Sequence, residues 1–362
     1  MTRPALLPII PRTRERTLEI DLFLRDRSWA GVMIRTKVIG TGSYLPDRVV
    51  TNEEVARSLG VPPARIERLT GIRERRWAAE HEAPSDMAIA AGRRALDAAG
   101  CQASDIDAII LSTTSPDMAF PSTACFVQRG LGCRRVGAFD VSASCSGFLY
   151  GLSMAQAMIH SGQVGTCLVV ASEVKSRFLD PNDEATAMLF GDGAGAVILR
   201  GEEDQNPQWH GLLGVRLYAD GSRHELIRVP AGGSRAPSSL DTLARREHVL
   251  RMRGASLFRT ATRRIQQAIQ DMLKEFGVRL DDVKQLVLHQ ANGRILTHVA
   301  DGLGIPLDKV SSVIERYGNT SSASLPIALD AAVGAGRILS GDLVLLGSFG
   351  GGLTWATSLV RW

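Results

Sequence analysis

Apolar residues along the chain gather in short continuous runs that alternate with longer segments of helical spacing. The runs that predict strands covered on both faces are Ala108–Leu111, Ala138–Val141, Thr166–Ala171 and Ala194–Leu199. Between the second and third runs, apolar side chains recur nearly all round a helix from Ser146 to His160, with Gly162 after its end. A helix that is apolar on every side is expected to be buried.

Other segments extend the same alternation. Thr36–Gly40 is a short predicted strand, and a helix is predicted to begin at Ser85-Asp86 and to end at Gly100. The Gly/Ser/Pro-rich stretch Ala231–Ser239 predicts a mobile loop, and a long amphipathic helix is predicted over Ser256–Phe276. Strands that alternate with helices in this way indicate an α/β protein.

The second half of the chain repeats the order of the first. Asp105–Leu111 matches Asp282–Leu288, which follows it by 177 positions, and Cys145–Leu152 meets Ser322–Leu329 at the same offset. We therefore predict two copies of one α/β unit related by a pseudo-twofold axis, with corresponding strand ends close together. Ligands in open α/β sheets bind at those carboxyl ends. The predicted parts are an extension over residues 1–33, a first half over residues 34–205 and a second half over residues 206–362.

Composition narrows the class of protein. Hydrophobic residues make up 44% and charged residues 22% of 362, as in soluble globular proteins, and the net charge of +4 is too small to imply nucleic acid binding. The chain has no stretch that approaches 18 consecutive apolar residues, so the sequence predicts no membrane span. Residues 1–33 lack the apolar core of a signal peptide, so we expect a disordered extension, or a start of the natural chain at Met33.

The five cysteines are scattered, without a CxxC pair or a zinc-type cluster with histidine. We therefore expect at least one free thiol, no metal and a reducing cytoplasmic location. In Asp140–Phe148 a strand ends, small residues turn the chain, and Cys145 stands at the start of the buried helix. A helix N-terminus stabilises a thiolate, which makes Cys145 the candidate nucleophile. Small buried apolar positions are predicted for Cys101, Cys125, Cys133 and Cys167.

Two further polar clusters follow predicted strands or precede predicted helices. In His289–Asn292 the histidine comes directly after the strand Leu286–Leu288, and the repeat brings it near Cys145. A lone histidine is commonly a hydrogen-bonded core group, but this placement favours catalysis. In Gly318–Ser324 we expect the serines to cap the next helix while Asn319 points into the site.

Three glycine-rich stretches have different interpretations. Gly40-Thr41-Gly42 follows a strand but lacks the third glycine of a dinucleotide fingerprint, so we reject that function. Phe190–Ala196 indicates close backbone packing, since no Lys-Ser/Thr pair follows to hold a phosphate. Phe349–Gly352 could present backbone N–H groups to an oxyanion.

Taken together, these segments resemble the 3-oxoacyl-[acyl-carrier-protein] synthase III family, the initiating condensing enzymes of the thiolase superfamily. The resemblance runs from about Ile34 to Trp362. The motifs that carry it are Gly40–Pro46, Thr70–Arg75, the Cys145 segment, Phe190–Ala196, His289–Asn292, Gly318–Ser321 and Phe349–Trp355. It implies a five-layer αβαβα thiolase fold, a homodimer, and condensation of an acyl-coenzyme A primer with malonyl-acyl carrier protein to initiate fatty acid synthesis. It implies no metal or redox cofactor.

The resemblance also implies roles for particular residues. Cys145 would hold the acyl group, and the backbone N–H groups of Cys145 and Gly351 would form the oxyanion hole. His289 and Asn319 would donate hydrogen bonds to the malonyl thioester oxygen as CO₂ leaves.

Binding residues follow from the same resemblance. Phe120 matches a residue that reaches the partner's acyl pocket, Arg177 matches a coenzyme-contacting arginine, and Asn292 is expected to bind substrate. Arg294 matches the arginine that docks the acidic carrier. Further arginines that either extend this dock or only enrich the surface are Arg251, Arg253, Arg259, Arg263 and Arg264.

The chain departs from the family where coenzyme A is recognised. Arg65 stands at the position of the aromatic that stacks on adenine, Leu69 at that of a neighbouring arginine, and Ala255 at that of a pantetheine-contacting asparagine. The primer could therefore be unusual or arrive on another carrier. The main alternative is a specialised-metabolism relative that condenses such a primer or transfers an acyl group to a hydroxyl or amine. A non-catalytic partner subunit would usually lack the nucleophile, and Cys145 is present. A cysteine hydrolase is possible in principle, but the resemblance implies a dry tunnel that excludes water.

Overall fold

The two halves of the chain form two five-stranded sheets that share one strand order. The structure is a computed structural model that describes residues 34–203 and 210–362, so the extension predicted over residues 1–33 and the predicted boundary after residue 205 lie outside the described residues. The first sheet runs β1 (Ile34–Tyr44), β7 (Gly193–Glu203), β6 (Thr166–Glu173), β4 (Ala108–Ser112), β5 (Gly137–Val141). The second runs β8 (Gly211–Ala219), β14 (Thr354–Arg361), β13 (Leu343–Gly350), β11 (Val283–Leu288), β12 (Val310–Ser311).

Strand directions repeat as well. In each sheet the three strands at one side are parallel to one another: β4 pairs with β5 and β6, and β11 pairs with β12 and β13. The remaining pairings, β6–β7, β1–β7, β13–β14 and β8–β14, are antiparallel. The internal repeat predicted from the sequence is therefore confirmed.

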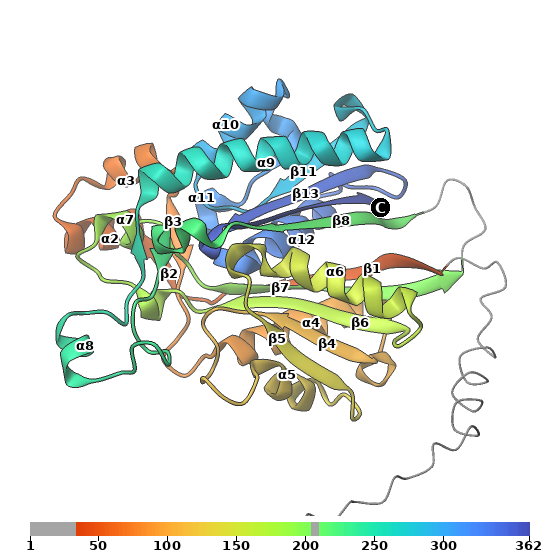
Figure 1. Cartoon of the computed structure of the whole chain (residues 1–362), viewed down its shortest axis with the longest axis horizontal. Helices are drawn as coiled ribbons and strands as arrows, with labels where there is room; N and C mark the ends of the chain where they lie inside the picture. Colours follow the sequence, from red (N-terminus) through yellow and green to blue (C-terminus); the bar gives the residue numbers. More distant parts are fainter. Residues whose placement is uncertain (1–33, 204–209) are drawn as a thin grey trace, which may run out of the picture.

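A pair of helices lies between the two sheets and forms the middle of five layers (Figure 1). These are α6 (Gly147–His160) and α12 (Ser324–Gly334), and both are apolar on nearly every side. Their buried side chains pack against Ile110 of one sheet and Leu346 of the other in one continuous core. The buried helix predicted from the apolar spacing is α6, so that prediction is confirmed.

Helices also cover the outer face of each sheet (Figure 1). The first sheet packs against α4 (Pro84–Ala99) and α5 (Thr123–Leu131), and the second against α9 (Gly254–Phe276) and α10 (Gly293–Leu303). Because successive strand residues face opposite sides, Ile109 packs outward under α4 and α5 while Ile110 packs inward. Both faces are buried, which explains the continuous apolar runs in the sequence.

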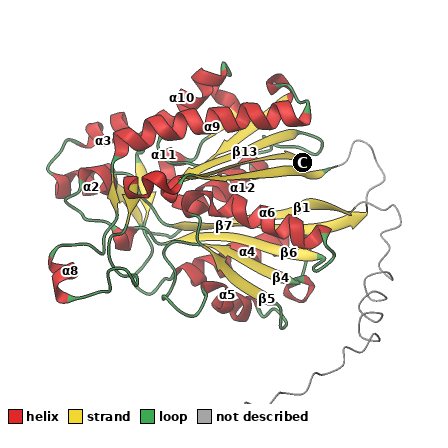
Figure 2. Cartoon of the chain, in the orientation of Figure 1, coloured by secondary structure: helices red, strands yellow, loops and turns green. Residues whose placement is uncertain are grey.

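The shorter elements gather at the end of the sheets where the parallel strands finish (Figure 2). They are the strand pairs β2 (Val49–Thr51) with β3 (Glu74–Arg76) and β9 (Ile227–Arg228) with β10 (Arg251–Met252), and the helices α2 (Asn52–Leu59), α3 (Pro63–Thr70), α7 (Glu184–Ala187), α8 (Leu240–Ala244) and α11 (Ile314–Tyr317). Several of them line the cavity described below. Within the described ranges no helix is long and apolar enough to cross a membrane.

The predicted elements differ from the observed ones mainly at their ends. The helix predicted over Ser256–Phe276 begins two residues earlier, and the strand predicted over Thr36–Gly40 extends in both directions. Gly100 ends α4 in the left-handed conformation that glycine favours. At Gly191 a Cβ would lie 2.4 Å from the carbonyl oxygen of Tyr317, so close backbone packing is confirmed for this glycine-rich stretch.

Candidate active site

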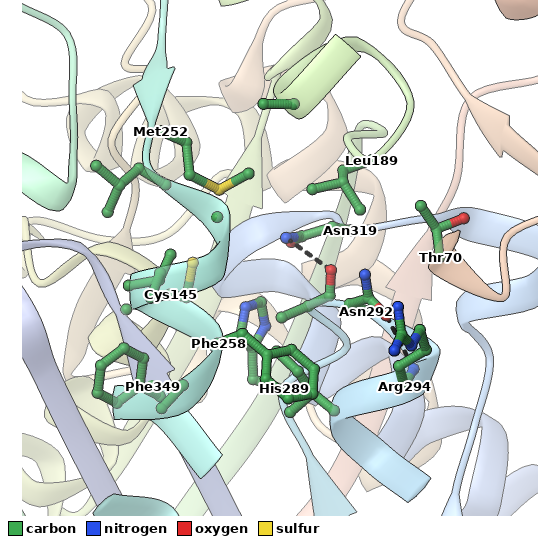
Figure 3. Close-up of a pocket in the computed structure, with 18 of the residues that line it drawn as sticks. Thr70, Cys145, Leu189, Met252, Phe258, His289, Asn292, Arg294, Asn319 and Phe349 are labelled. Atoms are coloured by element: carbon green, nitrogen blue, oxygen red, sulfur yellow. Dashed lines mark hydrogen bonds between the residues drawn. The ribbon is translucent and has the colours of Figure 1, made fainter. Parts of the chain in front are cut away.

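One cavity of about 820 Å³ brings together the three residues that the sequence singles out for catalysis. Cys145, His289 and Asn319 all line it, and Figure 3 shows them facing the same space. Cys145 comes from the first half of the chain, whereas His289 and Asn319 come from the second. The repeat thus places the carboxyl ends of corresponding strands around one site, as predicted.

Cys145 lies in a tight turn that leads directly into the central helix α6. The turn is a 3₁₀ helix over Ser144–Ser146, and Ser144 has φ of 51°, a sparsely populated value for a non-glycine residue. The side chain of Cys145 is 7% exposed. Gly350 packs against it so closely that a Cβ there would lie 2.7 Å from the Cys145 nitrogen. Only a glycine leaves this space beside the thiol open.

The surroundings of Cys145 favour the thiolate. Burial disfavours the charged form, and so does the nearby carboxylate of Glu173. The charge and hydrogen bond of His289, together with the hydroxyl of Ser321, outweigh both and lower the pKa of Cys145 to about 7. A substantial fraction of the thiol is therefore ionised at neutral pH, as a nucleophile requires.

His289 is held by Ser324, a serine that the sequence analysis expected to cap the next helix. The His289 backbone N–H donates to the carbonyl of Gly347 on β13 at 2.8 Å, which fixes the residue at the end of β11. The Ser324 hydroxyl oxygen lies 2.6 Å from Nδ1 of His289 and accepts the Gln290 N–H at 3.0 Å. Among the hydrogen bonds of the described residues, Nδ1 is the one acceptor within reach of the Ser324 hydroxyl proton, so we assign that proton to Nδ1, which leaves the proton of neutral imidazole on Nε2.

Asn319 is held by the glycine-rich stretch around Phe190. Its backbone N–H donates to Leu189 at 2.9 Å, and its carbonyl accepts the Gly191 N–H at 3.1 Å. The side-chain Oδ1 accepts the backbone N–H of Ser321 at 2.9 Å. This bond orients the carboxamide, whose Nδ2 donates to the Ala291 carbonyl at 3.3 Å and faces the cavity.

The serines between Asn319 and α12 do not cap that helix. No side-chain cap forms at either the 3₁₀ turn Ser321–Ala323 or α12, so this prediction is wrong. Instead the hydroxyl of Ser321 contacts Cys145, that of Ser322 reaches Glu173, and that of Ser324 reaches His289. The sequence signal was present in the serine-rich turn, but the partners lie in distant segments.

The cavity lining includes the residues at which the chain departs from the family that it resembles. They are Arg65, Leu69 and Ala255. Arg65 Nε lies 2.7 Å from a carboxylate oxygen of Glu184, which also lines the cavity, so an ion pair joins α3 to α7 there. The two residues predicted for substrate and carrier binding are also here: Asn292 and Arg294 line the cavity, and the Asn292 side chain caps α10 by accepting the Arg294 N–H at 2.9 Å.

Other predicted site residues have contacts of a different kind. Arg177 is outside the described cavity lining, and its guanidinium donates to the carbonyls of Ala79, Glu80 and Glu82. Phe120 is 87% exposed and also outside that lining. Gly351 lines the cavity, but its N–H donates to the Ser144 hydroxyl at 3.0 Å, so an oxyanion would have to displace this hydroxyl.

The remaining cysteines divide by burial. Cys133 and Cys167 are buried as predicted, and burial raises the pKa of Cys167 to about 12. Cys101 is half-buried, and Cys125 is exposed on α5, so the prediction of a buried position is wrong for Cys125. All five cysteines are free, and residues 34–203 and 210–362 contain no group of three or more His, Cys, Asp or Glu that could hold a metal ion.

Two repeated sheets, with a cysteine at the start of one central helix and a histidine and an asparagine from the other half, form the arrangement that the resemblance to the condensing enzymes of the thiolase superfamily implies. Models described as 3-oxoacyl-[acyl-carrier-protein (ACP)] synthase III and its C-terminal part match residues 139–221 and 273–362. The chain is 45% identical over 325 residues to β-ketoacyl-[acyl-carrier-protein] synthase III of Roseiflexus castenholzii. The aligned region covers 90% of this chain and 97% of the relative.

Solved structures show the same similarity as the sequence comparisons. The 3-oxoacyl-[acyl-carrier-protein] synthase III of Aquifex aeolicus superposes with a TM-score of 0.83 at 41% identity, over 90% of this chain and all of that one. The priming β-ketosynthase of the R1128 polyketide pathway also gives 0.83, at 35% identity, over 91% and 96%. The chain therefore belongs to the 3-oxoacyl-[acyl-carrier-protein] synthase III family of acyltransferase-type condensing enzymes. The expected thiolase-like fold is confirmed.

Proposed function

We propose that the protein condenses an acyl thioester primer with malonyl-acyl carrier protein and so initiates fatty acid synthesis. The observation that carries this proposal is the meeting of Cys145, His289 and Asn319 in one cavity of about 820 Å³. A thiolate, an imidazole and a carboxamide are the groups needed first to hold an acyl chain and then to stabilise an enolate.

In the first half-reaction the Cys145 thiolate attacks the thioester carbonyl of the primer. The sulfur reacts as the thiolate, its proton having passed to solvent, while Nε2–H of His289 donates a hydrogen bond to it. The carbonyl oxygen becomes an oxyanion, the C–S bond of the primer then breaks, and the departing thiolate takes a proton from solvent. Cys145 is left as a thioester. The N-terminus of α6 and the N–H groups of Cys145 and Gly351 favour negative charge at this point.

In the second half-reaction malonyl-acyl carrier protein occupies the cavity. His289, through Nε2–H, and Asn319, through Nδ2–H, donate to the malonyl thioester oxygen. As the C–C bond to the carboxylate breaks, CO₂ leaves and the electron pair forms an enolate. The enolate carbon attacks the acyl group on Cys145, the Cys145 thiolate departs, and a 3-oxoacyl product remains on the carrier. The residues of this chain supply each step without a metal or redox cofactor.

The carrier would dock at the cavity mouth. Arg294 lines that mouth, and Arg259, one of the further arginines, lines it too. Arg264 is engaged elsewhere, since its guanidinium packs over the Trp355 ring at 5.2 Å and pairs with Asp220. We therefore assign docking to Arg294 with Arg259, and substrate contact to Asn292. Carrier docking and a coenzyme contact by Arg177 remain proposals.

A homodimer in the cytoplasm completes the proposal. Phe120 presents a large aromatic side chain that is 87% exposed, and β5 is an edge strand of the first sheet. Both features support a second copy that covers this face and receives Phe120 in its acyl pocket.

A second candidate function is supported by the mouth of the cavity. The Arg65–Glu184 ion pair occupies the region where the family resemblance implies adenine stacking. A specialised-metabolism enzyme with an unusual or carrier-borne primer, or one that transfers the acyl group to a hydroxyl or amine, would have less need of a coenzyme A contact there. Condensation remains the first candidate because both His289 and Asn319 line the cavity.

The test is intact-protein mass spectrometry after incubation with a panel of acyl-coenzyme A and acyl-carrier thioesters, followed by malonyl-acyl carrier protein. We expect an acyl mass on Cys145 that disappears as a 3-oxoacyl product forms. Transfer to an added hydroxyl or amine acceptor without CO₂ release would favour the second candidate. Cys145→Ala serves as the control, and an adduct that persists in this variant would refute the role of Cys145.

A further inference from the structure

Two serine hydroxyls flank the sulfur of Cys145 from equivalent positions of the two halves. Ser144 and Ser321 are 177 positions apart, the offset of the internal repeat, and both have positive φ, of 51° and 54°. Their hydroxyl oxygens lie 3.9 and 3.5 Å from Sγ. The Ser144 hydroxyl accepts the Gly351 N–H. The Ser321 hydroxyl faces a different partner, the buried carboxylate of Glu173.

Glu173 is the last residue of β6 and is fully buried, with no lining contact to the described cavity. Ser321 Oγ donates to its Oε1 at 3.1 Å, and Ser322 Oγ donates to the same oxygen at 2.8 Å. The other oxygen, Oε2, accepts from Ser115 Oγ at 2.7 Å and lies 3.1 Å from Nζ of Lys175. The proposed reaction uses none of these groups.

The surroundings of Glu173 favour its ionised form. Burial disfavours its charge, but the Lys175 ammonium and the hydroxyls of Ser115 and Ser322 outweigh this effect and hold the pKa of Glu173 below its ordinary value. Lys175 is itself 8% exposed and also donates to Thr114. Burying an ion pair costs free energy, and breaking one is strongly destabilising. Such a pair placed next to the hydroxyl that contacts a nucleophile suggests a function there.

The Ser321 hydroxyl has one proton and two candidate acceptors, Sγ of Cys145 and Oε1 of Glu173. A thiol has its own proton to donate, and a thioester sulfur is a weak acceptor, so in both states the hydroxyl proton is better placed on Glu173. A thiolate is a charged acceptor and competes for that proton. The titratable groups that face the sulfur are His289 and Glu173, with Lys175 behind Glu173.

We propose that the Ser321 hydroxyl donates to Sγ of Cys145 while the sulfur is an anion, and turns to Glu173 when the sulfur carries a proton or an acyl group. Ser321 thus contacts the reacting atom, whereas Glu173 and Lys175 are positioning residues that act through it. The inference rests on the proposed function in so far as Cys145 is its nucleophile. It adds a third group, besides His289 and the helix N-terminus, that selects the thiolate for acylation.

Alkylation by iodoacetamide across pH tests the proposal on the full chain, with peptide mapping to separate Cys145 from the exposed Cys125. Ser321→Ala removes one hydrogen bond to a charged group, so we expect the alkylation midpoint of Cys145 to rise by about one pH unit and the rate at neutral pH to fall about tenfold. Ser321→Gly also removes the hydroxyl and suits the positive φ, so it must give the same shift even if the alanine variant folds poorly.

Two further variants separate this role from a merely structural one. Ser322→Ala removes a buried hydroxyl that also binds Glu173 but has no contact with Sγ among those described, so its shift must be smaller. Glu173→Gln removes the negative charge that disfavours the thiolate, so the midpoint must move down, opposite to the Ser321 variants. Loss of packing alone would not give shifts of opposite sign.

A partial reaction gives the second readout. Ser321→Ala keeps the backbone N–H that holds Asn319, so acyl loading should slow while malonyl decarboxylation continues at the wild-type rate. An unchanged midpoint in both Ser321 variants, or an equal shift in Ser322→Ala, would overturn the proposal and leave the proposed function intact. If Cys145 of the unaltered protein shows no enhanced alkylation near neutral pH and takes no acyl group, the proposed function itself fails.

Discussion

Replacing Asn319 by alanine should separate the two half-reactions. The backbone of Asn319 is held by Leu189 and Gly191 on one side and does not depend on the side chain. The substitution therefore removes only the carboxamide that faces the malonyl thioester. Acylation of Cys145 does not use this group, so the acyl-enzyme should form at close to the wild-type rate.

The size of the effect follows from the number of donors that the enolate oxygen loses. His289 and Asn319 each supply one, and removal of one preorganised donor costs about 10²–10³ in rate. The alanine variant also leaves the Ser321 N–H without its acceptor, at a cost of about 1–3 kcal/mol in stability. Asn319→Asp keeps an oxygen for that N–H but has no donor, so it should lose decarboxylation at least as severely while retaining more stability.

The assay measures acyl mass on Cys145 and CO₂ release from malonyl-acyl carrier protein with the same enzyme samples, alongside thermal unfolding. We expect a full adduct in all three proteins and CO₂ release at least about 10²-fold slower in the two variants than in the wild type. Decarboxylation at the wild-type rate in either variant would refute the role given to Asn319. A missing adduct in both would show that the carboxamide also serves acylation.

Three other outcomes can be checked by the same means. Arg294→Glu should raise the KM for malonyl-acyl carrier protein about tenfold at low salt, with the difference shrinking as salt screens the contact; an unchanged, salt-independent KM would remove this residue from the dock. Ser144→Ala frees the Gly351 N–H, so acyl loading should speed up by a few-fold; slower loading would show that the hydroxyl itself donates to the oxyanion. Ser324→Ala removes the hydrogen bond that keeps the His289 proton on Nε2, so decarboxylation should fall about tenfold or more, and an unchanged rate would contradict that tautomer.

The sequence predicts the parts of this fold whose physical cause is local. Apolar runs identify the buried strands, and an apolar helix that follows a turn of small residues identifies α6 and, through it, Cys145. The repeat then brings His289 to the same end of the sheets. Asn319 could be predicted from its position in the polar turn that precedes α12.

The features that sequence analysis missed depend on contacts between distant segments. The strand predicted over Thr166–Ala171 stops short of Glu173, which is the last residue of β6. A charged residue at a strand end is ordinarily solvated. The burial of Glu173 becomes intelligible only when Lys175 and the serines of the second half surround it. In the same way, Cys125 is exposed because it lies on the outer side of α5, and helical spacing alone does not show what covers that side.

The repeat also explains how a symmetric fold supports an asymmetric reaction. The equivalent of Cys145 in the second half is Ser322, whose hydroxyl binds Glu173 rather than facing the cavity. The equivalent of Glu173 is Gly350, where any side chain would approach the Cys145 nitrogen to 2.7 Å. One half therefore supplies a thiol and a buried carboxylate behind it, and the other supplies a hydroxyl for that carboxylate and an empty position beside the thiol. Ser322→Cys would restore symmetry at the first position but remove the hydroxyl that binds Glu173 behind Cys145. Gly350→Glu would restore it at the second but fill the space beside Cys145.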